Sequence, residues 1–230
     1  MPEYSERDKC KAMEGTATGQ HYGSFEDAYA YFNQHLFDHA LPRCLVTMQR
    51  RNSSRAYFAP ERFAHRVADA VIAELAFNPD YFLGRADIEI LSSLVHEMVH
   101  CWQVHYGMPS RPGYHNREWA AKMEALGLMP SDTGKPGGKR TGQRMAHYLI
   151  PGGCFAQAAE ALLATGFHLH WQSPRLPSAQ IDTRQARSRR SKTRFTCPDC
   201  GQNAWGAPSA ALRCGHCDTA MMPEERDDTT

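Results

Sequence analysis

The chain has 230 residues, of which 42% are hydrophobic and 22% are charged, and its formal net charge is +1. This composition is typical of a folded globular protein and excludes a disordered chain. The N-terminal residues contain no apolar run that resembles a signal peptide, and no stretch approaches the roughly eighteen apolar residues of a membrane span. We therefore expect a cytoplasmic protein with no membrane partner.

The N-terminal part of the chain predicts a polar segment followed by a helix. Residues 1–22 are polar and mixed in charge, and we expect them to be loosely ordered. Ser24 is a suitable N-cap, with Asp27 three residues later, and apolar residues then recur at helical spacing until Leu41-Pro42. The compact part of the chain is therefore predicted to begin at about residue 23.

Three short apolar runs after this helix have the composition of strands. They cover residues 45–49, 55–59 and 70–77. A turn-like segment separates the first two runs, which therefore predict a β-hairpin. The third run ends at Asn78-Pro79, as a strand entering a turn would. Together the three runs predict a small antiparallel sheet.

A buried amphipathic helix is predicted from Asp87 to about Tyr106. Apolar residues recur there at three- and four-residue spacing, Asp87 is a plausible N-cap, and Gly107 ends the helix. The segment His96-Glu97-Met98-Val99-His100 lies inside this helix. On a helix, residues four apart lie on one face about a turn apart.

This segment has the spacing of a catalytic zinc site. Two imidazoles four residues apart can bind one Zn²⁺, and Glu97 between them can act as general base toward a water at the open position of the metal. The pattern HExxH is only moderately specific, and its alternative interpretation is two ordinary buried histidines with a solvated glutamate. We favour the zinc site, because two His and a Glu converging on an apolar helix face would otherwise need other partners.

A catalytic zinc needs a third protein ligand, for which we consider residues downstream of His100. The candidates are His105, His115, Glu118 and Glu124. His105 lies on a different face of the helix from His100. His115 follows a Gly/Pro-rich loop at residues 107–115 and precedes a second helix at residues 116–126, where a chain that doubles back can present it. We favour His115, and Glu118 is the alternative.

The remainder of the first domain predicts two strands and one helix. The expected strands cover residues 147–150 and 167–171, and the helix covers residues 155–165. Residues 130–142 are rich in Gly and Pro, do not match a phosphate-binding loop, and predict a mobile loop near the active cleft. In the second strand, His168 and His170 alternate with apolar residues and are expected to face solvent.

A basic linker is predicted at residues 173–194. Residues 135–196 contain eleven Lys or Arg against two acids, and the linker holds most of them. Six of these side chains are candidates for contacting nucleic-acid phosphates: Arg184, Arg187, Arg189, Arg190, Lys192 and Arg194. The alternative is a solvated spacer that self-repulsion keeps extended.

Four of the eight cysteines form a second metal-binding pattern. The pairs Cys197/Cys200 and Cys214/Cys217 are two CxxC knuckles separated by thirteen residues. This spacing predicts a closed, structural Cys₄ zinc site in a ribbon at residues 195–219, followed by an acidic tail at residues 220–230. His216 is an outside alternative ligand. A domain this small has almost no core, so we expect zinc to supply its folding energy.

The segments Val95-His96-Glu97-Met98-Val99-His100-Cys101-Trp102-Gln103 and Gly113-Tyr114-His115-Asn116-Arg117-Glu118-Trp119 resemble the SprT-like family. That family includes the bacterial SprT proteins and, more distantly, the eukaryotic protease Spartan. The likeness runs from about Ser24 to Gln172 and continues into the C-terminal cysteines. The resemblance implies His96, His100 and His115 as zinc ligands, Glu97 as the catalytic acid/base, and Glu118 and Trp119 as supporting or packing residues.

The resemblance also implies an α+β, zincin-like metalloprotease core, here at residues 23–172, in front of the zinc ribbon. We expect a zinc metalloendopeptidase with one catalytic and one structural Zn²⁺. Its expected partners are a protein substrate and DNA, because family members of the Spartan type are associated with cleaving proteins trapped on DNA. The alternatives are a nucleic-acid-associated regulatory protein without proteolytic activity and a peptidase that ignores nucleic acid.

Overall fold

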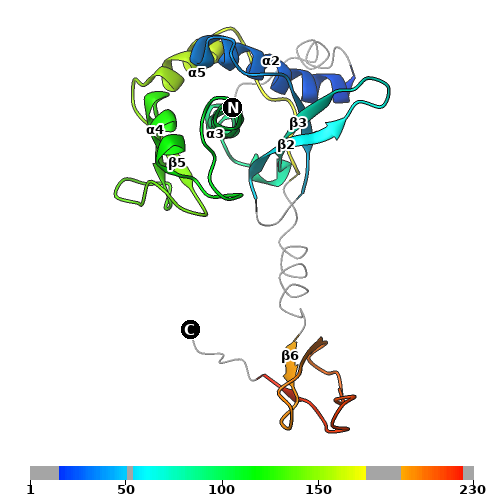
Figure 1. Ribbon diagram of the computed structural model, residues 1–230. Helices are drawn as coiled ribbons and strands as arrows, with labels where there is room; N and C mark the ends of the chain where they lie inside the picture. The colour runs from blue at the N-terminus through cyan, green and yellow to red at the C-terminus, as the bar shows by residue number, and fades with distance from the viewer. Residues whose placement is uncertain (1–15, 51–53, 175–192, 225–230) are drawn as a thin grey trace. The chain divides into compact units, whose positions relative to one another are not determined.

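The computed structural model describes residues 16–50, 54–174 and 193–224. The chain divides into two compact units, residues 1–174 and residues 175–230, and each is described by itself. The first unit contains four helices and two small sheets within the described residues (Figure 1). None of the described helices is both long enough and apolar enough to cross a membrane.

The first described helix, α2 (Ala17–Phe37), begins earlier than its sequence pattern predicts. Its N-cap is Thr16, whose hydroxyl accepts from the Gly19 N–H, and Ser24 instead lies within the helix and donates to the Gln20 carbonyl. The expectation of a loosely ordered segment up to residue 22 is therefore wrong from residue 17 onward. The helix ends at Asp38, which adopts the left-handed conformation.

The main sheet contains β1 (Cys44–Met48), β2 (Ala56–Ala64) and β3 (Val71–Phe77) in the order β1-β3-β2. The β1 strand pairs with β3 in parallel, and β2 pairs with β3 antiparallel, so the sheet is mixed and the predicted hairpin between the first two strands is wrong. The reason lies in β3, whose residues from Ala73 to Phe77 are all buried. A strand that is buried on both faces belongs in the centre of a sheet.

A buried carboxylate joins the three strands. Glu74 in β3 has no exposed surface and accepts hydrogen bonds from Thr47 Oγ1 at 2.5 Å, Gln49 Nε2 at 2.8 Å and Tyr57 OH at 3.2 Å. Arg62 lies 3.7 Å from the same carboxylate. Because a buried charge is costly unless it is paired and hydrogen-bonded, this network keeps β2 in place at the edge of the sheet.

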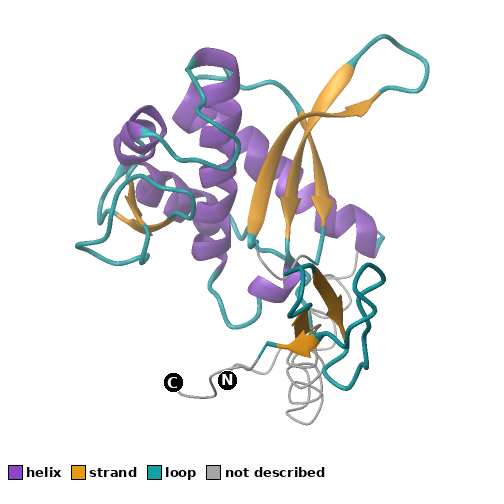
Figure 2. Cartoon of the chain, turned by 60° about the horizontal axis from the view of Figure 1, so that its bottom comes forward, coloured by secondary structure: helices purple, strands orange, loops and turns teal. Residues whose placement is uncertain are grey.

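The central helix α3 (Asp87–Tyr106) has the predicted bounds. Its N-cap is Ala86 rather than Asp87, and the Glu89 carboxylate accepts from the Ala86 N–H at 3.0 Å. Asp87 accepts instead from the Leu169 N–H at 3.1 Å. The helix contacts α2, α4, α5 and β2, and its buried apolar residues form the middle of the main core. Figure 1 shows α3 surrounded by these elements, and Figure 2 shows the same helices beside the sheet.

The rest of the first unit comprises α4 (Arg117–Ala125), α5 (Cys154–Ala164) and a two-stranded antiparallel sheet of β4 (Leu128–Ser131) and β5 (Ala146–Leu149). A short 3₁₀ helix, η1 (Pro79–Tyr81), follows β3. The predicted strand at residues 167–171 is wrong, because this segment has no regular secondary structure. Its alternating pattern has no neighbouring strand to pair with.

The second unit is a three-stranded sheet of β6 (Thr193–Thr196), β7 (Asn203–Gly206) and β8 (Met222–Pro223), in the order β7-β6-β8. Its small core contains Phe195, Met221 and two cysteines. Two predicted boundaries change. Arg194, expected in the linker, lies in β6, and the segment at residues 220–230, expected to be an acidic tail, contains β8. An ion pair between Arg194 and Glu224, at 2.5 Å, joins these two parts.

Candidate metal and active site

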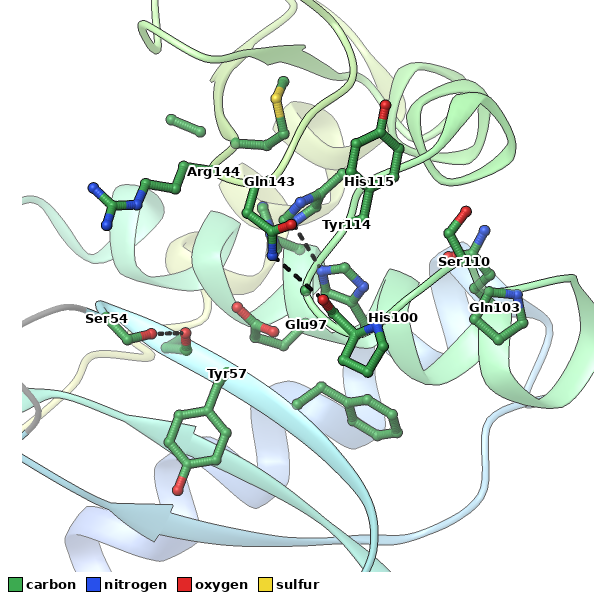
Figure 3. Close-up of a pocket in the computed structure, with 18 of the residues that line it drawn as sticks. Ser54, Tyr57, Glu97, His100, Gln103, Ser110, Tyr114, His115, Gln143 and Arg144 are labelled. Atoms are coloured by element: carbon green, nitrogen blue, oxygen red, sulfur yellow. Dashed lines mark hydrogen bonds between the residues drawn. The ribbon is translucent and has the colours of Figure 1, made fainter.

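Three imidazoles converge at the C-terminal half of α3. The Nε2 atom of His115 lies 3.3 Å from Nε2 of His96 and 3.1 Å from Nε2 of His100. Zinc–nitrogen bonds of about 2.0–2.1 Å in tetrahedral geometry place two ligand nitrogens about 3.3 Å apart. Two of the three nitrogen pairs therefore have the spacing of ligands to one zinc ion, and the three ligand atoms all lie within 4.8 Å of one another. Figure 3 shows His100 and His115 facing each other.

The local structure explains why these three side chains meet. His96 and His100 are one turn apart on α3, and His115 stands immediately before α4, whose N-cap is Asn116. Two backbone hydrogen bonds with Gly142 form an isolated bridge at His115, and His115 Nδ1 also lies 3.1 Å from the Gly142 carbonyl. The bridge holds the ring with Nε2 directed at the two helix histidines.

The other candidates for the third ligand lie elsewhere. Glu118 accepts hydrogen bonds from Gln103 Nε2 at 2.7 Å and from the Met108 N–H at 2.8 Å, so it anchors the loop between α3 and α4. Glu124 forms an exposed ion pair with Arg140. His105 is exposed on α3. Among the four candidates, the structure brings only His115 to the histidine pair.

Burial lowers the pKa of all three imidazoles. It lowers the pKa of His100 to about 3, and the pKa values of His96 and His115 also lie below the ordinary value. For His96, the neighbouring imidazoles act in the same direction. These side chains are therefore neutral near pH 7, which is the form that binds a metal.

Glu97 lies beside the three histidines and lines the same cavity. It is 6% exposed, and burial raises its pKa to about 8, although a hydrogen bond from the Phe58 backbone opposes this shift. Phe58 belongs to β2, so the edge strand of the main sheet is in direct contact with the carboxylate. A bound cation at the histidine cluster would favour ionised Glu97, since opposite charges stabilise one another.

An open cavity of about 780 Å³ lies over this cluster. One side is formed by β2, and the other by the loop at residues 109–115 together with residues 143–147, which lead into β5. Asp132, from the Gly/Pro-rich segment at residues 130–142, also lines the cavity. Three arginines contribute positive charge to the walls: Arg55, Arg111 and Arg144.

Comparison with known proteins supports a family for this chain. The sequence profile described as SprT-like family matches residues 25–136, a range that contains α3, the three histidines and α4. The chain is also 34% identical, over 58 residues, to a Salmonella typhimurium protein described as "Uncharacterized protein in mucB 3'region". That match covers 25% of this chain and 78% of the Salmonella protein.

The chain belongs to the SprT-like family. At family level this membership supports a metallopeptidase of the SprT type, and zinc is the metal that agrees with both the family and the histidine cluster. The mixed α+β structure agrees with a zincin-like core. The profile ends before β5 and the ribbon, so those parts of this SprT-like chain are described from the structure alone.

Trp119, which the resemblance implies as a packing residue, is fully buried against the cluster. Its ring centroid lies 4.4 Å from that of His115, 4.8 Å from that of His96 and 5.4 Å from that of His100. Its indole Nε1 has no hydrogen-bond partner in the described structure. Trp119 therefore contributes an apolar wall behind the imidazoles rather than a polar contact.

Sequence reasoning misses the role of one further histidine in this SprT-like site. His147 in β5 lies with its Nδ1 atom 3.1 Å from Nδ1 of His96, and it also lines the cavity. In sequence it is a single histidine at the start of a short strand. No pattern links it to His96, 51 residues earlier, because β5 reaches α3 only in the folded chain.

The four cysteines of the second metal-binding pattern also lie close together in the structure. The Sγ atoms of Cys197, Cys200, Cys214 and Cys217 all lie within 4.8 Å of one another, and Cys200 Sγ is 3.6 Å from Cys214 Sγ. Hydrogen bonds from the backbone of Cys217 and His216 lower the pKa of Cys214 to about 7, which favours the thiolate. Side-chain hydrogen bonding with Cys200 raises the pKa of Cys217 to about 12. The exposed His216 side chain is not part of the cluster.

The candidate nucleic-acid contacts are mostly outside the described part of this SprT-like chain. Five of the six side chains fall within residues 175–192: Arg184, Arg187, Arg189, Arg190 and Lys192. The sixth, Arg194, is 44% exposed in β6 and is paired with Glu224. Its partner in the β6–β7 pairing is Trp205, which is 60% exposed.

Proposed function

We propose that this chain is a zinc-dependent endopeptidase of the SprT type that cleaves DNA-associated proteins. The observation that carries the proposal is the convergence of three Nε2 atoms, with His115 Nε2 3.1 Å from that of His100 and 3.3 Å from that of His96. Glu97 lies beside them in an open cavity. His96, His100 and His115 would hold the ion. The set leaves one position of a tetrahedral zinc site free, as a catalytic site requires.

A zinc ion held by these three histidines would supply the Lewis-acid chemistry that polarises a peptide carbonyl and acidifies a water molecule. Glu97 then acts as the general base that takes the proton of the attacking water and transfers it to the leaving amine nitrogen. Its position in the cavity, next to two of the ligands on α3, suits this transfer.

The shape of the cavity supports a polypeptide substrate. It is open to solvent and extends along β2, which lies at the edge of the main sheet. The backbone of an edge strand can pair with an extended peptide. A substrate chain could therefore lie between β2 and the loop at residues 109–115, with its carbonyl over the histidine cluster.

A structural zinc ion in the Cys₄ cluster completes the proposed metal content at two ions per chain. Four sulfur ligands fill a tetrahedral site and leave no position for substrate. The described core of the ribbon is small, so metal binding would supply most of its stability.

The proposed location on DNA rests on charge and on one aromatic side chain. Residues 135–196 carry a large excess of Lys and Arg, and the exposed Trp205 offers a face on which a base could stack. Contacts between Lys or Arg and phosphates would make DNA binding strongly dependent on salt. The physiological protein substrate would then be selected by its presence on the same DNA.

The test uses the purified full chain with its metal content measured. We expect two zinc ions per chain, cleavage of histones and casein, and faster cleavage of histones when single- or double-stranded DNA is present. The Glu97→Gln variant should keep both ions and lose activity by about 10²- to 10⁴-fold, the usual contribution of a general base. The matched control is Glu124→Gln, at an exposed position on α4 away from the cluster.

Three other outcomes would contradict the proposal in different ways. Unchanged cleavage by Glu97→Gln would exclude the mechanism. Two bound zinc ions, salt-sensitive DNA binding and no cleavage under any DNA condition would favour a regulatory, nucleic-acid-associated protein. Cleavage that DNA does not stimulate would favour a general peptidase.

A further inference from the structure

A chain of hydrogen bonds leads from the histidine cluster back to the first turns of α3. His96 Nδ1 lies 3.1 Å from His147 Nδ1, and His147 Nε2 lies 2.9 Å from the Ser92 hydroxyl oxygen. The Ser92 hydroxyl donates to the Glu89 carbonyl at 2.7 Å. His147, which β5 supplies, thus connects two positions of α3 that are four residues apart.

The backbone carbonyl at the end of this chain determines where each proton lies. A carbonyl can only accept, so the Ser92 hydroxyl must donate to Glu89, and the Ser92 oxygen is left to accept from His147 Nε2–H. A neutral imidazole carries one N–H, so His147 Nδ1 is then an acceptor. His96 Nδ1–H therefore donates to it.

The opposite arrangement of protons fails at two points. If His147 Nδ1 donated to His96, the proton of His96 would lie on Nε2, the atom that faces His115 Nε2 at 3.3 Å. A protonated nitrogen has no lone pair for a metal. His147 Nε2 would also need a proton from Ser92, whose single hydroxyl proton is already used by Glu89.

We propose that His147 is a positioning residue of the metal site, which holds His96 in the tautomer that presents Nε2 to zinc. The inference rests on the proposed zinc site and adds a residue beyond the family match, which ends at residue 136. Histidine ligands generally donate their second ring N–H to an outer partner, and loss of that partner weakens metal binding. At His115 the corresponding partner is the Gly142 carbonyl.

The inference also explains what the small β4–β5 sheet contributes. His147 pairs with Pro130 in this sheet, and Gly142 lies in the connection between the same two strands. One hairpin-like segment therefore supplies the outer partners of two metal ligands, His96 and His115. Both partners act on Nδ1, so both ligands offer Nε2 to the same point.

The first test compares zinc binding by the full chain and four variants. Both sites are loaded, and the zinc of the histidine site is withdrawn with a graded series of chelators while the Cys₄ zinc is followed as an internal reference. His147→Phe keeps a ring of similar size but removes the acceptor, and it should weaken zinc binding at the histidine site by about 10- to 100-fold. His147→Asn places an amide oxygen near the position of Nδ1 and should restore most of the affinity.

Two further variants distinguish the hydrogen-bond chain from general damage. Ser92→Ala leaves the His147 ring in place but removes the acceptor that orients it, so its affinity should lie between those of wild type and His147→Phe. The matched control, His105→Phe, changes an exposed histidine of α3 outside the cluster and should bind zinc as the wild type does. Equal zinc affinity in His147→Phe and wild type would overturn the inference.

A measurement on the unmodified protein removes any dependence on how the variants fold. In zinc-loaded protein with ¹⁵N-labelled histidine rings, long-range ¹H–¹⁵N spectra should show His96 metallated at Nε2, with a proton on Nδ1 that exchanges slowly with solvent. A His96 bound to zinc through Nδ1, or a rapidly exchanging Nδ1 proton, would overturn the inference. Absence of zinc from the histidine cluster of the wild type would instead contradict the proposed function.

Discussion

The indole ring of Trp119 lies edge-on against the imidazole of His115, with ring centroids 4.4 Å apart and an angle of 76° between the planes. The backbone N–H of Trp119 donates to Asn116 Oδ1 at 3.0 Å, and this bond caps α4 directly after His115. The packing of α4 against α3 and the position of the third ligand therefore depend on the same residue. Stability and metal binding should respond together when it is changed.

Replacement of Trp119 by Ala should lower the free energy of unfolding of the first unit by about 3–5 kcal/mol, because it empties a fully buried site. Trp119→Phe keeps an aromatic wall and loses only an N–H that has no partner, so its effect should be clearly smaller. Urea unfolding of both variants, together with chelator competition for zinc, measures the two effects. Equal losses in the two variants would contradict the role of Trp119 as an apolar wall.

Glu118→Ala should loosen the loop that carries His115. The substitution leaves the Gln103 amide and the Met108 N–H without their carboxylate acceptor, which destabilises by about 1–3 kcal/mol. Zinc binding at the histidine site should weaken as well, because the loop between α3 and α4 positions the third ligand. Glu124→Ala is the matched control, since it removes only an exposed ion pair worth about 1 kcal/mol or less. If Glu118→Ala retained normal zinc affinity, the loop would not depend on this carboxylate.

The metal-free protein should be most stable near neutral pH. Burial lowers the pKa of His100 to about 3 and that of His147 to about 4 in the folded protein. In the unfolded chain both imidazoles have the ordinary pKa of 6.5. The unfolded chain therefore binds more protons below pH 6.5, and stability is lost as the pH falls toward 4.

Glu97 acts in the opposite direction, because its folded-state pKa of about 8 lies above the ordinary 4.5. The folded chain keeps this proton as the pH rises, and that contribution to stability is lost toward pH 8. Urea unfolding midpoints of the metal-free chain, measured between about pH 5 and pH 8, test the loss of stability on both the acid and the alkaline side. Glu97→Gln should flatten the fall in stability on the alkaline side, and an unchanged fall in this variant would contradict the assignment.

Loss of zinc from the Cys₄ cluster should unfold the ribbon and leave the first unit intact. Cys200→Ser removes one of four ligands, and the described ribbon core is too small to fold without metal. Limited proteolysis should then cleave within residues 193–224, while residues 54–174 resist digestion. Cys154→Ser, at an exposed cysteine outside both clusters, is the control. A ribbon that stays protected in Cys200→Ser would show that its fold does not need the metal.

Local patterns in the sequence predict the parts of the site that lie within one element. The bounds of α3 follow from the spacing of its apolar residues, and the positions of His96, Glu97 and His100 follow from the helical repeat. The two cysteine knuckles are likewise local, since each is a turn of four residues. These features depend on neighbours in sequence, so the sequence carries them in full.

The wrong predictions of secondary structure and strand pairing concern contacts between segments that are distant in sequence. Alternation predicts that a segment is a strand and which face it buries, but it does not identify the neighbouring strand, so the hairpin between β1 and β2 was wrong. Residues 167–171 alternate as a strand would but have no partner strand. Their Leu169 N–H is instead bonded to Asp87, 82 residues earlier.

The sequence by itself determined the chemistry of this SprT-like protein: two histidines and a glutamate on one helix, four cysteines in two knuckles, and a small set of candidates for the third ligand. Only the tertiary structure decided which candidate reaches the pair. Glu118 and His115 are three residues apart, but folding brings His115 to His100 and Glu118 to Gln103 and Met108. The same holds for His147, whose link to His96 exists only once β5 packs beside α3.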